Sequence, residues 1–244
     1  LKENYANEKS LEIDPIELFE SLKKVGIAAS PEGGRPILTG VYFNNENEKT
    51  ELAATDSYRL ATHDITSFPI KDAGILSFRS LNETAKIFEQ TDDKISINST
   101  ERELHFYDSK FSASIRKLEG NFPEYKNLFP KETLFSIEVN KKTILEALDR
   151  ATVVAEGFIP VKLEVVDSGT LKITTINKDI GGGNEEVSIK TLGLEVGDVS
   201  GFTMSFNPNY LMQGIEVLDG DTVYISLACA IIAMNEVEPN TQVQ

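Results

Sequence analysis

The feature that most constrains the fold is an internal repeat, in which one order of helix and strand patterns occurs twice along the chain. EIDPIELFESLKKV at 12–25 matches EVNKKTILEALDRA at 138–151 in pattern, with an offset of 126 residues between Ile13 and Val139. LSFRSLNETAKIF at 76–88 matches MSFNPNYLMQGIEV at 204–217, with an offset of 128. A repeat of this length has the size of a whole domain. The chain is therefore predicted to contain two copies of one domain.

The first copy has the pattern of an α+β domain. Asp14 and Pro15 match an N-cap followed by proline at the first helical position, and Leu18, Leu22 and Val25 follow at helical spacing. The other elements predicted for this copy are a helix at 79–90 and strands at 37–43, 50–65, 74–78, 94–99, 103–108 and 110–118.

The second copy repeats this order. Its predicted helices lie at 140–155 and 207–218, and its predicted strands at 134–139, 161–176 (two strands around a turn), within 181–190, at 201–206 and at 221–234. The glycine run that opens 181–190 lacks the lysine and spacing of a phosphate-binding loop, so it is interpreted as a mobile connection. The proline-punctuated segment 119–130 is interpreted as the boundary. We therefore expect a polar linker or tail at 1–8, one domain at 9–130 and another at 131–244.

Charge and cysteine content narrow the function. The net charge of −15 argues against a nucleic-acid binder that is basic throughout, although an acidic protein can still carry a basic face. Basic residues do fall on or beside the predicted helices, where the alternative reading is an ordinary solvated helix face. The single cysteine, Cys229, excludes an internal disulfide and fits a reducing cytoplasm. No apolar run is long enough to span a membrane, and the first residues lack the apolar segment of a secretory signal.

The residues offer little for catalysis or for a metal. His63 and His105 both lie in strand patterns, and no paired Cys/His spacing accompanies them. Ser21 and Lys24 match the SxxK pattern of acyl-transferring enzymes, but the companion Ser-Asp-Asn and Lys-Thr-Gly motifs are missing from the sequence. The sequence therefore favours a binding or scaffolding protein without a cofactor over an enzyme.

One stretch does not fit a simple strand. LAATDSYRLATHDI at 52–65 begins and ends like a half-buried strand, but Thr55-Asp56-Ser57-Tyr58-Arg59 form a polar run that Leu60 closes. Together with RPILTGVYF, LEGNFPEYKNLFP and SFNPNYLMQGIEVL, this stretch follows the order and spacing of the bacterial DNA polymerase III beta subunit, the replicative sliding clamp. The chain resembles the second and third domains of that family over nearly its whole length. The combination of Thr-Asp-x-x-Arg-Leu with Gly-x-Phe-Pro-x-Tyr is specific.

The resemblance implies a DNA clamp fold, in which each domain places helices on one side of antiparallel sheets. Family chains have three such domains and form a head-to-tail homodimeric ring around duplex DNA. The ring is not catalytic; it tethers the DNA polymerase III alpha subunit, and it also binds the clamp loader and repair polymerases, through short linear motifs. Attraction between helix cations and phosphates would be independent of DNA sequence, as sliding requires.

Site residues follow from the same resemblance. In the family, a hydrophobic pocket between the second and third domains receives the linear motif. The matching positions are Leu38, Thr55, Ser57, Tyr58, Arg59, Leu60, Pro123, Asn127, Leu128, Asn207 and Tyr210. The residues expected to face DNA are Lys23, Lys24, Arg35, Arg79, Lys141 and Lys142.

The chain departs from the family pattern at several positions. Ser57 and Tyr58 stand where glycine and histidine are common, and Asn127 stands where arginine is frequent. We expect the family's last strand, a Met-Pro-Met-like segment, to be missing, because no such segment occurs up to Gln244. The alternative reading is a clamp-like protein-interaction domain without a DNA role.

Overall fold

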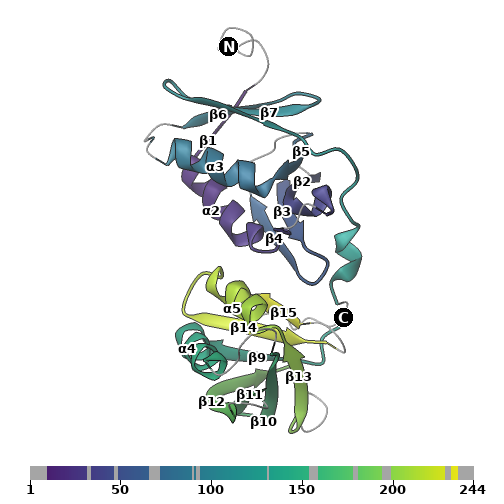
Figure 1. Ribbon diagram of the computed structural model, residues 1–244, viewed down its shortest axis with the longest axis vertical. Coiled ribbons are helices and arrows are strands. Elements are labelled where there is room, and N and C mark those ends of the chain that lie inside the picture. Colours follow the sequence, from purple (N-terminus) through teal and green to yellow (C-terminus); the bar gives the residue numbers. More distant parts are fainter. Residues whose placement is uncertain are drawn as a thin grey trace. The chain divides into compact units, whose positions relative to one another are not determined.

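The computed structural model describes residues 10–31, 34–46, 49–65, 72–89, 91, 94–130, 132–153, 159–177, 181–193, 199–228 and 232–235. The chain divides into two compact units, Leu1–Tyr125 and Lys126–Gln244, and each is described by itself (Figure 1). Among the described residues, no helix has the length and apolar character needed to cross a membrane.

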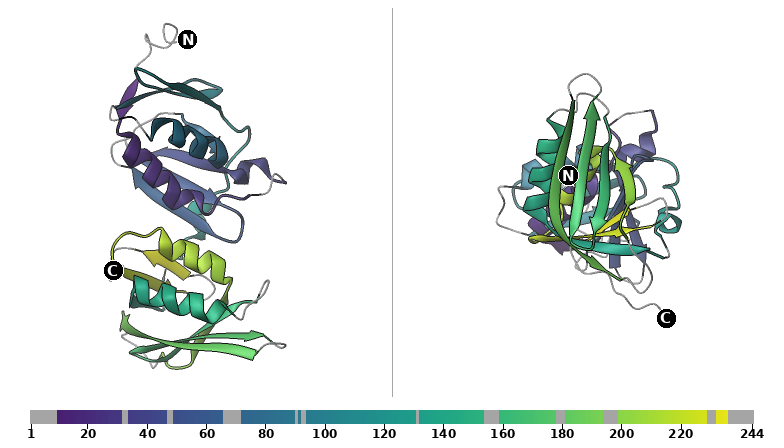
Figure 2. Two further views of the ribbon diagram at one scale, coloured as in Figure 1. Left: turned by 60° about the vertical axis from the view of Figure 1, so that its left-hand side comes forward. Right: turned by 90° about the horizontal axis from the view of Figure 1, so that it is seen from below.

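The first unit combines two antiparallel sheets with two helices. One sheet has the order β1-β6-β7-β8 and the other β4-β3-β2-β5. Helices α2 and α3 lie side by side, as Figures 1 and 2 show from different directions. The bounds are β1 Leu11–Ile13, α2 Pro15–Gly26, β2 Gly40–Glu46, β3 Lys49–Thr55, β4 Leu60–Ile65, β5 Gly74–Ser77, α3 Phe78–Phe88, β6 Ile95–Ser99, β7 Glu103–Tyr107 and β8 Ser112–Arg116.

The second unit has one seven-stranded sheet, in the order β13-β10-β11-β12-β9-β14-β15. Strand β12 is long: its first part pairs with β11 and its last four residues pair with β9, so it joins the two halves of the sheet. The bounds are β9 Phe135–Asn140, α4 Lys141–Thr152, β10 Val161–Asp167, β11 Thr170–Asn177, β12 Gly181–Leu192, β13 Phe202–Phe206, α5 Pro208–Glu216, β14 Thr222–Leu227 and β15 Ile232–Asn235.

The predicted repeat is present in the strand order. The run β5-β2-β3-β4 of the first unit corresponds to β13-β10-β11-β12 of the second, and β1-β6-β7 corresponds to β9-β14-β15. The helix caps correspond as well, because the side chains of Asp14, Ser77, Asn140 and Asn207 each accept a backbone N–H at a helix start. Between Ser77 and Asn207 the offset is 130, not 128, so the helix alignment read from the sequence was wrong by two residues.

Each unit has its own apolar core. In the first, Leu18, Leu22 and Val25 of α2 are buried among side chains of α3 and of both sheets. In the second, Ile144 and Leu148 of α4 are buried among side chains of the other helix and of the sheet. The helical spacing of apolar residues therefore predicted the buried face of α2 and α4 correctly.

Several predicted boundaries were wrong. The stretch 50–65 is two strands with a turn between them, 221–234 contains parts of two strands, and Pro36–Thr39 is a 3₁₀-helix rather than the start of a strand. The glycine run belongs to β12 and is not a loop. A Cβ at Gly183 would lie 3.0 Å from the Ala151 carbonyl oxygen, so the glycine permits close approach of α4 to the sheet.

Candidate peptide-binding turn and helix cations

The polar run is the connection of a β-hairpin. Thr55 at the end of β3 lies opposite Leu60 at the start of β4. The Thr55 hydroxyl accepts a hydrogen bond from the Ser57 N–H at 3.2 Å and donates one to the Arg59 carbonyl oxygen at 2.7 Å. The threonine side chain thus bridges the two ends of the turn, which explains a polar residue at a position that is 5% exposed.

Asp56 supplies the remaining bonds of the turn. Its Oδ1 accepts from the Tyr58 N–H at 2.9 Å and from the Arg59 N–H at 3.0 Å. Its Oδ2 accepts from Arg59 Nε at 3.0 Å, which makes an ion pair. The Asp56 side chain is only 7% exposed, so these bonds are partly shielded from water. Sequence reasoning did not include Asp56 among the site residues, although its place in Thr-Asp-x-x-Arg-Leu was visible.

The outer part of the turn is exposed. Ser57 has a φ of 80°, in the left-handed region that costs a residue with a side chain about 1 kcal/mol or more. Tyr58 is 85% exposed. Arg35, which was predicted to face DNA, donates from Nη1 to the Ser57 hydroxyl at 3.5 Å, so the structure brings it to this turn. Leu38, on the 3₁₀-helix Pro36–Thr39, is buried.

The segment that carries Pro123 is anchored by aromatic rings. The Tyr125 hydroxyl donates to the Glu51 carboxylate and accepts from Asn44 Nδ2. The rings of Tyr42, Phe122 and Tyr125 contact one another, with centroid separations from 5.1 to 6.4 Å. Burial, together with the hydrogen bond to Glu51, raises the pKa of Tyr125 well above its ordinary value. Pro123 itself is exposed.

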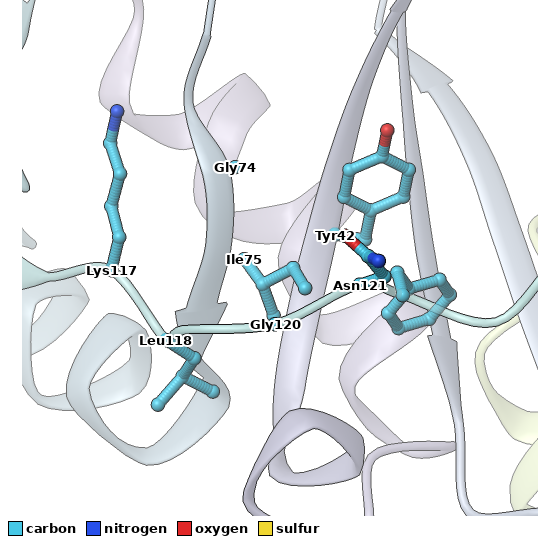
Figure 3. A pocket seen from close by; sticks show the side chains of 8 residues that line it. Tyr42, Gly74, Ile75, Lys117, Leu118, Gly120 and Asn121 are labelled. Carbon is cyan, nitrogen blue, oxygen red and sulfur yellow. The ribbon is translucent and has the colours of Figure 1, made fainter. Parts of the chain in front are cut away.

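A hollow of about 260 Å³ lies beside this aromatic cluster (Figure 3). The segment that runs from β8 past Gly120 crosses the sheet here, and the hollow lies over glycine backbone. Its lining comes from Tyr42, Gly74, Ile75, Lys117, Leu118, Gly120, Asn121 and Phe122. None of the residues predicted to bind a peptide lines it.

The predicted peptide-binding residues of the second unit differ in how exposed they are. Asn207 is the N-cap of α5, and its Oδ1 accepts from the Asn209 N–H at 3.0 Å. Tyr210 is half-buried in the first turn of that helix. Asn127 and Leu128 are exposed, and 51% of the Leu128 surface is open to solvent. Asn207 therefore has a structural role that accounts for it without a ligand.

The helix cations are only partly available to phosphates. Lys142 lies 3.8 Å from the Glu146 carboxylate, and the Lys141 ammonium donates to the carbonyl oxygens of Glu216 and Leu218 at the end of α5. By contrast, Lys23 and Arg79 are exposed and make no ion pair within the ranges that the structure describes. Lys24 is half-buried.

The helices as a group are close to neutral. Within their bounds, α2, α3, α4 and α5 carry seven basic and six acidic residues. The whole chain has 24 basic and 39 acidic residues. The helices are therefore less acidic than the rest of the chain, but they are not strongly basic.

The alternative function, acyl transfer, would need an accessible serine nucleophile, and Ser21 is not accessible. Ser21 is 5% exposed, and its hydroxyl donates to the Glu17 carbonyl oxygen at 2.7 Å, one turn earlier in α2. In the part of the chain that the structure describes, no three metal-ligating side chains gather into a group that could hold an ion.

Comparison with known proteins decides the family. Residues 12–124 match the model of the DNA polymerase III beta subunit central domain, and residues 126–242 match that of its C-terminal domain. The chain belongs to the DNA polymerase III beta subunit family. Its members are non-catalytic polymerase subunits of DNA replication, so the predictions of the family, of the clamp fold and of a protein that is not an enzyme are confirmed.

Individual relatives agree with this assignment. The beta sliding clamp of Halalkalibacterium halodurans is 32% identical over 224 residues, which are 88% of this chain and 57% of that protein. The clamp of Bacillus subtilis is 30% identical, over 89% of this chain and 58% of its own length. A crystal structure of the Bacillus subtilis sliding clamp superimposes with a TM-score of 0.86 at 26% identity, covering 97% of this chain and 63% of that one. The chain thus spans less than two thirds of the length of these relatives.

Proposed function

We propose that this chain is part of a sliding clamp, which encircles duplex DNA as a homodimeric ring and tethers polymerases and other partners through linear motifs. Family membership supports the proposal, as does the geometry of the Thr55–Leu60 turn. The observation that supports peptide binding most is the turn itself, whose hydrogen bonds hold Tyr58 exposed and Leu60 half-buried. A cytoplasmic location belongs to the same proposal.

The peptide part of this proposal uses the turn as a docking surface. Apolar contacts with Leu60 and Tyr58 would hold the leucine and phenylalanine side chains of a motif, and Arg59 would bond its backbone. The DNA polymerase III alpha subunit, the clamp loader and the repair polymerases are the expected sources of such motifs. Asn127, Leu128, Asn207 and Tyr210 stay predictions for the same ligand.

Titration with a Gln-Leu-x-Leu-Phe-type peptide tests the docking surface. Arg59→Ala and Leu60→Ala are each expected to weaken binding about tenfold, because each removes a contact worth roughly 1.4 kcal/mol. Fluorescence anisotropy or calorimetry would give the dissociation constants. Arg150→Ala and Leu134→Ala are matched controls, since both residues are exposed and neither is among the predicted site residues. Equal affinity of the parent and both turn variants would reject the docking surface.

The DNA part of the proposal rests on the exposed helix cations. Lys23 on α2 and Arg79 on α3 are exposed and make no ion pair within the described residues, so their charges are open to phosphate. Contacts of this kind ignore base sequence, which suits a protein that slides. They also release counterions, so the observed affinity should fall steeply with salt.

The salt dependence of duplex binding tests this part. For the double variant Lys23→Gln/Arg79→Gln, the slope of log affinity against log salt is expected to become shallower by about 2, or about 0.9 for each lost contact. Lys110→Gln/Arg102→Gln is the matched control, because these exposed cations lie outside the helices. Electrophoretic or anisotropy titrations at several salt concentrations would provide the slopes. An unchanged slope in the helix variant would remove these two residues from the DNA-facing set.

One observation favours the second candidate, a clamp-like interaction domain without a DNA role. The helices carry almost equal numbers of basic and acidic residues, which gives a weaker attraction for DNA than a strongly basic lining would. The same titrations separate the two candidates. Peptide binding with no measurable duplex binding at low salt is the outcome expected for the interaction domain alone.

A further inference from the structure

Asp56 is the residue on which the exposed half of the turn depends. Tyr58 is 85% exposed, so packing does little to hold its backbone in place. What holds it is the hydrogen bond from its N–H to Asp56 Oδ1, and the same oxygen accepts the N–H of Arg59. The second carboxylate oxygen bonds Arg59 Nε, which directs the guanidinium group as well.

The conformation held in this way is not one that the backbone prefers. Ser57 lies at a φ of 80°, where a side chain is disfavoured. Such a conformation persists when surrounding bonds compensate for its cost, and here the bonds come from Thr55 and Asp56. If Asp56 were lost, the turn would populate other conformations, and a ligand would have to restore the order on binding. That ordering reduces affinity without removing any contact.

We propose that Asp56 is a positioning residue for peptide binding, acting through Tyr58 and Arg59 rather than by touching the peptide. This inference rests on the proposed docking function of the turn. It also makes Arg59 depend on its partner: part of the loss on removing Asp56 should come from a guanidinium group that is no longer directed. The carboxylate is suited to the role because its charge strengthens all three hydrogen bonds that it accepts, and the bond from Arg59 Nε is also an ion pair.

Two substitutions separate the bonds. Asp56→Asn keeps an acceptor for the two backbone N–H groups but replaces Oδ2 by an NH₂ group, which cannot accept from Arg59 Nε. Asp56→Ala removes all three bonds. With a Gln-Leu-x-Leu-Phe-type peptide we expect about threefold weaker binding for Asp56→Asn and about tenfold weaker binding for Asp56→Ala. In an Arg59→Ala background, Asp56→Asn should have little further effect, because the guanidinium group it directs is absent.

A spectroscopic signature reports the positioning directly. In nitrogen-15 NMR of the peptide-free protein, the Arg59 Nε–H should exchange slowly with water in the parent and rapidly in Asp56→Asn. Asp64→Asn is the matched control, since it removes an exposed carboxylate from β4 of the same hairpin and should change neither this signal nor the affinity.

The outcomes distinguish the two proposals. If the parent binds the peptide and both Asp56 variants, Asp56→Asn and Asp56→Ala, bind it as tightly as the parent does, the positioning role is overturned. The docking surface then still stands. Additive effects of Asp56→Asn and Arg59→Ala would also overturn it, because the two residues would then act separately. If the parent does not bind the peptide, the docking function fails, and the positioning role fails with it even where the NMR signal behaves as expected.

Discussion

Leu22→Ala should lower the free energy of unfolding of the first unit by about 2–5 kcal/mol, the range found when a buried leucine is truncated. Leu22 is 3% exposed and lies in the core shared by α2, α3 and both sheets of that unit. Its counterpart one repeat later, Leu148, is 0% exposed in the core of the second unit. Leu148→Ala should therefore cost a similar amount, but in the other unit.

Hydrogen exchange resolved by mass spectrometry can assign each loss to a unit. Leu22→Ala should speed exchange in peptides from α2 and β3, and Leu148→Ala in peptides from α4 and β11. The double variant should show both losses additively, because the two residues belong to different cores. Leu134→Ala, at a leucine that is 50% exposed, is the control and should change stability little. Faster exchange throughout the chain from either single variant would contradict separate cores.

Gly26→Ala should also destabilise the first unit, although helix propensity alone predicts the opposite. Alanine is favoured over glycine in a helix by about 1 kcal/mol. A Cβ at Gly26, however, would lie 1.9 Å from Cε2 of the Phe78 ring and 2.1 Å from its Cζ. Overpacking of this kind costs roughly 3 kcal/mol, so a net loss of about 2 kcal/mol is expected. Urea unfolding would measure it.

The change in stability caused by Gly26→Ala should reverse its sign when the Phe78 ring is removed, and this reversal is the control. In a Phe78→Ala background the ring is absent, so Gly26→Ala should stabilise the protein by up to about 1 kcal/mol relative to Phe78→Ala alone. Gly34→Ala adds a Cβ that meets nothing within 4 Å and should be close to neutral. If Gly26→Ala were neutral or stabilising in the parent, α2 and α3 would not pack as closely as Gly26 and Phe78 indicate.

Much of the fold could be predicted from the sequence because its signals are local. The Asp14 cap and the spacing of Leu18 and Leu22 involve residues a few positions apart, so they set the start and the buried face of α2 whatever surrounds it. The candidate site could be predicted only in part from the sequence. The polar run is visible in the sequence and the family resemblance implies its role, but the bonds that Thr55 and Asp56 make inside the turn could not be predicted from either.

The N-cap of α2 and the apolar periodicity of the helices were therefore determined by the sequence alone, because each depends on neighbours along the chain, and the repeat was visible because these local patterns recur. Only the tertiary structure decided the contacts of residues whose partners are far away in the sequence. Lys141 is predicted to face DNA, and that stays a prediction; the structure adds a hydrogen bond from its ammonium to the Leu218 carbonyl oxygen, 77 residues away. Tyr125 reaches Glu51 across 74 residues. The glycine run is a strand because it pairs with β11, and α4 approaches it closely at Gly183. Composition and spacing cannot predict such contacts, because the residues meet only after the sheets and helices have packed.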